Sequence, residues 1–250
     1  MLNRSIVRLG RKLIPRFVLD QINPFDRFMR EAVEEFVRQL PPRSKVLDAG
    51  AGEAQYRPVL EAAGHRYWAI DLGAGEPDWT YSGIDAFARV EDLPFAPGCF
   101  DGVMSLAVLE HTPYPQRALS EMNRALKPGG RLIIVVPTVW EEHQVPNDFY
   151  RFTRYGIQRL LEAAGFQVEG VRPIGGYFWF MGRKFIDLLG FFETFPRNLL
   201  WPLLALPFGL VLPALFKSLD WLDRDKHHTI GQLCYARKLR EAREPAWDKL

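Results

Sequence analysis

The sequence predicts an α/β fold built on a doubly wound, mostly parallel sheet. Short apolar runs alternate with segments of helical spacing within residues 45–172, and one more apolar run covers 230–237. Two glycines, Gly50 and Gly52, follow the first run, and the second run ends in Asp71. Strands of this kind bring their carboxyl ends to one edge of the sheet, where ligands of such folds bind.

The first half of the chain predicts a helix and then three strands. Asn23-Pro24 breaks the chain, Asp26 can cap a helix, and Pro41-Pro42 ends it. Apolar residues recur on one face of this helix, namely Phe28, Met29, Ala32, Val33, Phe36, Val37 and Leu40. The predicted strands are Lys45–Asp48, Tyr67–Asp71 and Phe100–Leu106, with a helix over Gln55–Ala63.

The second half continues the same alternation. A helix is predicted over Pro115–Leu126, and Lys127-Pro128-Gly129-Gly130 stops it. Thr153 caps another helix, which Gly165 closes. The predicted strands here are Arg131–Val136, Phe166–Arg172 and Ile230–Arg237.

Composition narrows the function classes. The chain has 32 basic and 30 acidic residues, so its net charge of +2 gives no general case for nucleic acid, and none is expected as a partner. Cys99 and Cys234 lie far apart without metal-ligand spacing, which predicts no metal and a reducing, cytoplasmic compartment. Residues 1–20 mix spaced arginines with apolar residues, which fits either a basic amphipathic membrane contact or an extra packed helix. That stretch does not resemble a secretory signal.

A turn with two glycines also occurs in ordinary strand-to-helix connections, so the residues around it must indicate whether it binds a nucleotide-like ligand and which one. Asp71 lies 19 residues after Gly52, where a carboxylate can accept hydrogen bonds from ribose hydroxyls. A nicotinamide dinucleotide site needs a third glycine where Gln55 stands. Asp48 would oppose a pyrophosphate but suits a cationic ligand such as an aminoalkyl sulfonium.

At these residues the chain resembles the class I S-adenosylmethionine-dependent methyltransferases, in particular the type 11-like methyltransferase domains. The matching segments are Val46–Gly52, Asp71, Glu91–Phe95, Phe100–His111 and Leu126–Gly130. The resemblance covers about 43–175 and resumes at 230–238. It departs from the family at Ala54, which replaces a third glycine, and at Ile84–Val90, an extra stretch that lets Asp85 compete with Asp92.

The resemblance implies a Rossmann-like, seven-stranded sheet that binds S-adenosyl-L-methionine. The implied cofactor-binding residues are Asp48, Gly50, Ala51, Gly52, Asp71, Leu72, Asp92, Leu93, Ser105, Leu106 and His111. His111 would lie near the methionine end of the cofactor, although Glu110-His111 also suits a simple helix cap.

The loop after the fifth strand, Pro137–Thr153, should lie over the cofactor's methyl group and serve the substrate. His143 is the candidate general base, Asp148 its orienting partner and Tyr150 the next catalytic candidate. Trp140 and Arg151 are candidates for substrate binding, with Arg151 suited to an anion. The alternative is that Asp148 and Arg151 form a structural ion pair and His143 packs the loop.

An apolar insert precedes the last strand. Leu199–Phe216 contains no charge, and Pro202, Pro207 and Pro213 predict a broken helical hairpin. In the resembled fold the strands on either side of the insert share one sheet, which excludes a single membrane span. The expected division is 1–22 as an amphipathic segment, 23–175 plus 228–240 as the methyltransferase domain, and 176–227 as the insert.

The predicted function is methyl transfer to an amphiphilic, lipid-linked or cell-surface glycan-related acceptor. Peripheral contact with the inner face of the cytoplasmic membrane is expected through 1–20 and 176–222. A soluble lid or dimer surface is the rival for the insert. The functional alternatives are a non-catalytic, membrane-associated module that retains the fold and a nicotinamide-dependent oxidoreductase.

Overall fold

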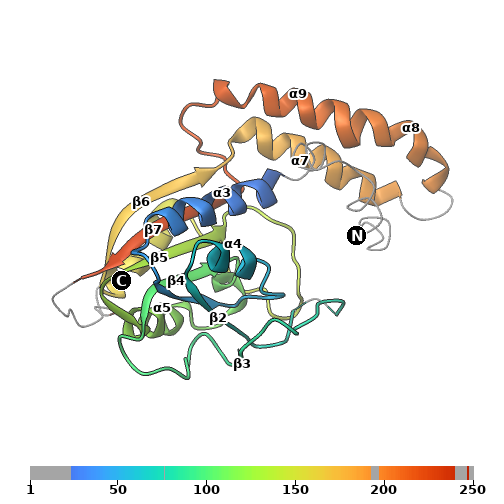
Figure 1. Cartoon of the computed structure of the whole chain (residues 1–250). Coiled ribbons are helices and arrows are strands. Elements are labelled where there is room, and N and C mark those ends of the chain that lie inside the picture. Colours follow the sequence, from blue (N-terminus) through green and yellow to red (C-terminus); the bar gives the residue numbers. More distant parts are fainter. Residues whose placement is uncertain (1–23, 76, 193–196, 240–246, 248–250) are drawn as a thin grey trace. The chain divides into compact units, whose positions relative to one another are not determined.

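The computed structural model describes residues 24–75, 77–192, 197–239 and 247, and it contains the predicted seven-stranded sheet. The strand order is β3-β2-β1-β4-β5-β7-β6 (Figure 1). The strands are β1 (Lys45–Ala49), β2 (Arg66–Asp71), β3 (Ala86–Phe87), β4 (Phe100–Leu106), β5 (Leu126–Pro137), β6 (Phe166–Ile174) and β7 (Gly231–Lys238). β1 pairs in parallel with β2 and β4, whereas β7 runs antiparallel to β5. This sheet confirms the Rossmann-like fold class.

The chain divides into two compact units, each described by itself below. The sheet unit comprises the described residues of 31–172 and 231–247, and the helical unit comprises 24–30 and 173–230. This division groups residues 24–30 with the insert, whereas the prediction placed them in the methyltransferase domain. The predicted amphipathic segment 1–22 lies outside the described residues.

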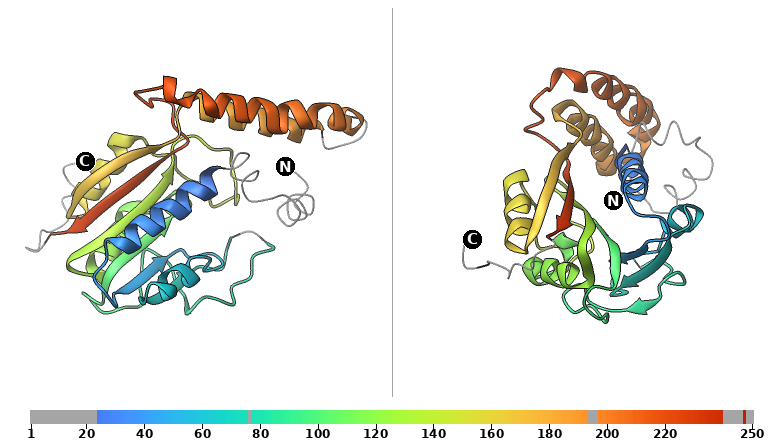
Figure 2. Two further views of the ribbon diagram at one scale, coloured as in Figure 1. Left: turned by 45° about the horizontal axis from the view of Figure 1, so that its top comes forward. Right: turned by 60° about the vertical axis from the view of Figure 1, so that its left-hand side comes forward.

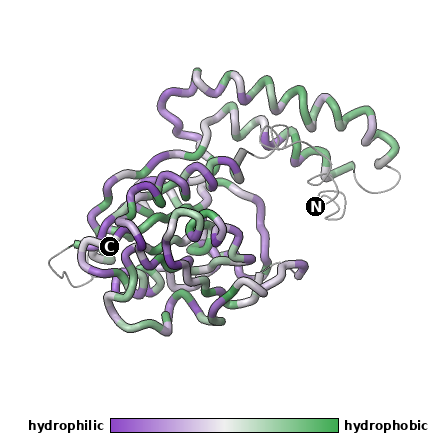
Figure 3. Tube along the Cα trace, viewed as in Figure 1, coloured by the Kyte–Doolittle hydropathy of each residue, from purple (hydrophilic) through white to green (hydrophobic). Residues whose placement is uncertain are grey.

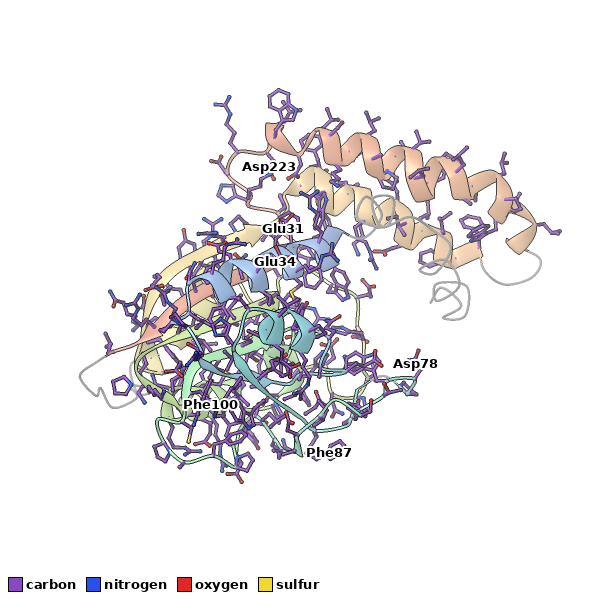
Figure 4. The ribbon with its side chains drawn as sticks, in the orientation of Figure 1. Glu31, Glu34, Asp78, Phe87, Phe100 and Asp223 are labelled. Atoms are coloured by element: carbon purple, nitrogen blue, oxygen red, sulfur yellow. The ribbon has the colours of Figure 1, made fainter. Side chains whose placement is uncertain are left out.

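Helices cover both faces of the sheet. α5 (Pro115–Ala125) and α6 (Arg154–Ala163) pack on the face that carries Leu47, Val103 and Ile134 (Figure 2). The opposite face is covered by α3 (Pro24–Arg38) and α4 (Arg57–Ala62). Here Tyr235 of β7 donates a hydrogen bond to the Ala32 carbonyl at 3.3 Å. The outer side of α3 is acidic, with Glu31 and Glu34 exposed (Figure 4).

Most predicted elements are present, and two differ for local reasons. α5 ends at Ala125, close to its predicted end at Leu126, but β5 already begins at Leu126, so Lys127-Pro128-Gly129-Gly130 belongs to the strand. Its pairing with β4 shifts register between Phe100 and Gly102, which accommodates the glycines as an irregularity. β3 lies in the stretch regarded as extra sequence, and its two residues are too few to produce a periodic pattern.

The helical unit contains two helical arms that lie side by side. The first arm is α7 (Tyr177–Leu189), and the second runs through α8 (Trp201–Leu206), a π-helical turn (Pro207–Val211) and α9 (Leu212–Ser218) (Figures 1 and 2). The second arm is continuous, so the prediction that its prolines break the helix is wrong. The π-helical turn shifts the hydrogen-bond register next to Pro207, which removes the need for a break.

Aromatic packing and carboxylate caps hold the two arms together. Phe185 stacks edge-on against Phe216, with ring centroids 5.0 Å apart. Asp220 accepts hydrogen bonds from the Gly176 and Trp179 amides, both at 3.1 Å. These bonds place a negative charge at the start of α7, where the helix dipole favours it.

Candidate active site

The turn after β1 has the geometry that only glycine tolerates well. Gly50 has φ +87° and Gly52 φ +56°, both in the left-handed region. A Cβ at Gly50 would lie 2.5 Å from a methyl carbon of Val108. The Gly50 and Ala51 amides both donate to the Ile70 carbonyl at 2.9 Å, which fixes the turn against the end of β2.

Asp71 is held beside this turn. Its Oδ2 accepts a hydrogen bond from the Gly52 amide at 2.9 Å, and its Oδ1 accepts one from the Gly73 amide at 2.8 Å. Each carboxylate oxygen has a further lone pair, so both can still accept a hydroxyl of a ribose. Leu72, the next residue, is 53% exposed and offers an apolar contact.

Asp48 is buried under the turn. The Tyr67 hydroxyl donates to its Oδ2 at 2.6 Å. Burial raises the pKa of Asp48 to about 7, against the lowering effect of the Tyr67 hydrogen bond. A cation bound near this carboxyl would favour its charged form, as predicted for a sulfonium or ammonium ligand.

The two acidic candidates for the adenine side have different surroundings. Asp85 Oδ2 accepts from the Ala69 amide and pairs with Arg57, both at 2.7 Å. Asp85 therefore ties β2 to α4. Asp92 is exposed, and its neighbour Leu93 is buried with its amide bonded to Glu121. Asp85 is thus engaged within the fold, and Asp92 stays the predicted cofactor-binding residue.

Ser105 and Leu106 are the last two residues of β4, and a turn follows them. Ser105 is fully buried, and its Oγ has no hydrogen-bond partner among the described residues. Leu106 is 9% exposed, and Ala107 after it has φ +57°. The turn that starts at Ala107 leads to the short helix Leu109–His111, where two of the site's polar side chains lie.

The substrate loop is fastened to that short helix. The Phe149 amide donates to the Glu110 carbonyl at 2.8 Å, and the Tyr150 hydroxyl donates to the Pro113 carbonyl at 3.0 Å. The Phe152 amide donates to the Pro137 carbonyl at 2.8 Å, which closes the base of the loop. The loop therefore stands over the carboxyl edge of the sheet, as predicted.

Within the loop, Asp148 and Arg151 form a bidentate ion pair with N–O distances of 2.6 and 2.8 Å. The Arg151 guanidinium holds the pKa of Asp148 at about 2, well below its usual range. Asp148 also accepts from the His143 amide at 3.1 Å and lies 3.4 Å from His143 Nδ1. Arg151 donates further to the Trp140 carbonyl at 3.3 Å, so its guanidinium is engaged by the loop. This arrangement fits the structural ion pair and also orients His143.

The structure assembles a cluster that sequence reasoning missed. Ligand atoms of Glu110, His111 and His143 all lie within 4.8 Å of one another. The two imidazole rings meet edge to face at 4.6 Å. Burial raises the pKa of Glu110 to about 8 and lowers that of His111. His143 is far from the other two in sequence, so no spacing signal could reveal the cluster.

Two aromatic residues near the cofactor turn were also missed. The Trp79 ring lies 3.1 Å from where a Cβ of Gly52 would stand, so it covers the turn. Tyr67 is the partner of Asp48 described above. Neither Trp79 nor Tyr67 belongs to a recognisable motif. The alternation of apolar and polar residues within β2 was the one signal available for Tyr67.

Comparisons with known proteins agree with this geometry. Residues 47–134 match the family model described as a methyltransferase domain. An uncharacterized methyltransferase of Mycolicibacterium gilvum is 29% identical over 154 residues, which cover 55% of this chain and 60% of that protein. The demethylmenaquinone methyltransferase of Mycolicibacterium vanbaalenii is 35% identical over 118 residues, 44% of this chain and 48% of that protein. The chain thus matches about half to three fifths of the length of these curated relatives.

A solved structure shares the fold. It is the Burkholderia thailandensis 1,6-didemethyltoxoflavin-N1-methyltransferase with bound 1,6-didemethyltoxoflavin and S-adenosylhomocysteine. The TM-score is 0.52 at 21% identity, with 96% of this chain and 91% of that chain covered.

The sheet order is that of a Rossmann-like fold, and the glycine turn and Asp71 lie at the carboxyl ends of β1 and β2. The residues that match the methyltransferase domain model run from β1 into β5, and the glycine turn after β1 lies within them.

Proposed function

We propose that this protein transfers the methyl group of S-adenosylmethionine to an amphiphilic, lipid-linked acceptor at a membrane surface. The observation that carries the proposal is an exposed apolar helical arm in the same chain as a methyltransferase domain. A glycan-related acceptor on a lipid carrier falls within this class.

The cofactor half of the proposal rests on the turn after β1. Gly50 and Gly52 hold the left-handed backbone of this turn, and Asp71 beside it keeps acceptor capacity on both oxygens. Asp48 supplies a buried carboxyl toward a cationic ligand. The nicotinamide alternative is disfavoured, because Gln55 stands in place of the third glycine and Asp48 would oppose a pyrophosphate.

Methyl transfer asks little covalent chemistry of the protein. The acceptor atom attacks the methyl carbon in line as the bond to sulfur breaks, so positioning and exclusion of water dominate. A hydroxyl acceptor must also lose a proton. His143 is the proposed base, held by Asp148 at its backbone amide and near its Nδ1, and Tyr150 lines the same loop.

The membrane half rests on the second helical arm. A helical run over Trp201–Leu222 is long and apolar enough to cross a membrane by length and composition, which alone is weak evidence. Several of its apolar side chains are exposed, with Leu203 at 73% and Leu206 at 62% (Figure 3 colours the hydropathy). Exposed apolar area on this scale marks an interaction surface.

Topology favours shallow insertion over spanning. β6 and β7 are neighbours in the sheet, so the insert between them leaves and returns on one side. If the second arm spanned the bilayer, the first arm would have to span it too, but α7 has 13 residues and a length of roughly 20 Å, against a bilayer core of about 30 Å. The proposed location is therefore the inner leaflet of the cytoplasmic membrane. One relative is named as a demethylmenaquinone methyltransferase.

The test is flotation of the protein with liposomes of anionic and zwitterionic lipid, followed by transfer of labelled methyl to a membrane extract. We expect co-flotation and label in the organic phase. Leu203→Gln with Leu206→Gln should lose both, whereas Tyr155→Gln, which alters an equally exposed side chain on α6, should lose neither. If the protein stays in the aqueous fraction and the label is found on a water-soluble product, the insert is better explained as a soluble lid or a dimer surface. Cofactor binding without any turnover would favour the non-catalytic module.

A further inference from the structure

Glu110, His111 and His143 have the composition of a metal site. One carboxylate and two imidazoles form a donor set that Zn²⁺ and other divalent transition metals take up in proteins, with remaining positions left for water or substrate. The three ligand atoms lie within 4.8 Å of one another, against about 3.3 Å between ligands of a tetrahedral site. Closure by roughly 1.5 Å would complete the set.

The lone pairs of this cluster are free to bind a cation. The Glu110 side chain is 1% exposed, and its Oε2 has no hydrogen-bond partner among the described residues. His111 Nε2 is also buried and has no hydrogen-bond partner among the described residues. Buried polar atoms without partners are costly, so two of them on neighbouring residues indicate a missing ligand.

The backbone fixes the tautomers that metal binding requires. His111 Nδ1 lies 2.6 Å from the Asn147 carbonyl oxygen, so Nδ1 carries the proton and Nε2 presents its lone pair. His143 Nδ1 lies 3.1 Å from the Glu141 carbonyl oxygen, which likewise leaves Nε2 for a ligand. Hydrogen bonds of this kind orient metal-binding histidines in known sites.

We propose that Glu110, His111 and His143 bind a divalent transition-metal ion of the Zn²⁺ class between the short helix after β4 and the substrate loop. The His143 side chain is 25% exposed, which gives the ion a path in from solvent. Its role in the reaction rests on the proposed function. An acceptor hydroxyl bound to the ion would release its proton to solvent more readily, and its oxygen would then bond the methyl carbon as the methyl–sulfur bond breaks. His143 would act as a ligand in that case and not as the base.

The test is calorimetric titration of the full chain, freed of metal by a chelator, with Zn²⁺ alone. We expect one ion per chain and at least tenfold weaker binding in His143→Ala and in Glu110→Gln. The matched control is His227→Ala, which removes an exposed histidine outside the cluster and should change nothing. Co²⁺ in place of Zn²⁺ should give visible absorption bands that His143→Ala abolishes.

The assignment is overturned by any of three results. These are no saturable Zn²⁺ uptake, equal weakening by His227→Ala, or loss of binding in one of the two cluster variants but not the other. Circular dichroism checks that each variant is folded. If Glu110→Gln does not fold, the Zn²⁺-dependent rise in melting temperature of wild type and His143→Ala decides. Neither readout needs methyl transfer, so this site and the proposed function can fail separately.

Discussion

The Gly52 amide donates a hydrogen bond of 2.9 Å to Oδ2 of Asp71. This bond joins the two parts of the cofactor site, the turn after β1 and the carboxylate after β2. The turn therefore positions the group that would hold the ribose, and a change in either residue should disturb both.

Gly50→Ala should destabilise the fold by about 2 to 4 kcal/mol. The new Cβ would meet Val108 at 2.5 Å, and φ +87° would cost about 1 kcal/mol in addition. Gly64→Ala isolates the cost of the positive φ, because Gly64 has φ +80° and no atom lies within 4 Å of where its Cβ would stand. Urea unfolding of both variants should give the larger loss for Gly50, and equal losses would refute the close contact.

Asp48 predicts a pH dependence of stability. Its folded pKa of about 7 lies above its ordinary value of 3.8, so the unfolded chain loses this proton first as pH rises. Wild type should therefore lose up to about 4 kcal/mol relative to Asp48→Asn between pH 4 and 7, and little more above pH 7.

Tyr67→Phe serves as the matched variant for that experiment. It removes the hydrogen bond that favours the charged carboxyl, so the fall in stability should extend to higher pH. A difference between wild type and Asp48→Asn that does not vary with pH would contradict the buried carboxyl.

The Asp148–Arg151 pair should stabilise the substrate loop. Arg151→Ala leaves Asp148, whose side chain is 4% exposed, without its bidentate partner, and should cost about 2 to 4 kcal/mol. With a folded pKa of about 2, the contribution of Asp148 is present above about pH 4 and is lost as pH falls through 2.

A double-mutant cycle checks this pair. The loss in Asp148→Asn with Arg151→Ala should be clearly smaller than the sum of the two single losses, as measured by thermal unfolding at pH 7. Additive losses would show that the two side chains act independently.

Sequence reasoning succeeded where structure is local. The glycine turn, Asp71 and the Thr153 cap, whose hydroxyl accepts from the Gly156 amide at 3.1 Å, each depend on a few neighbouring residues. The fold followed from the alternation of such elements.

Sequence reasoning failed for the second helical arm and for the contact between His143 and Glu110. The prolines of the second helical arm were expected to break it, but the π-helical turn at Pro207–Val211 absorbs them. His143 meets Glu110 because backbone bonds strap the loop to the short helix after β4, and no pattern in the sequence records those bonds.

The central claim is that the turn after β1 and Asp71 bind S-adenosylmethionine, and calorimetric titration with this cofactor tests it most directly. Wild type should bind one cofactor per chain. Asp71→Ala, which removes both the Gly52 hydrogen bond and the ribose acceptor, should bind at least tenfold more weakly, as expected for loss of charge-assisted hydrogen bonds of about 1.5 kcal/mol or more. Equal affinity in the two proteins, or no binding by either, would contradict the account.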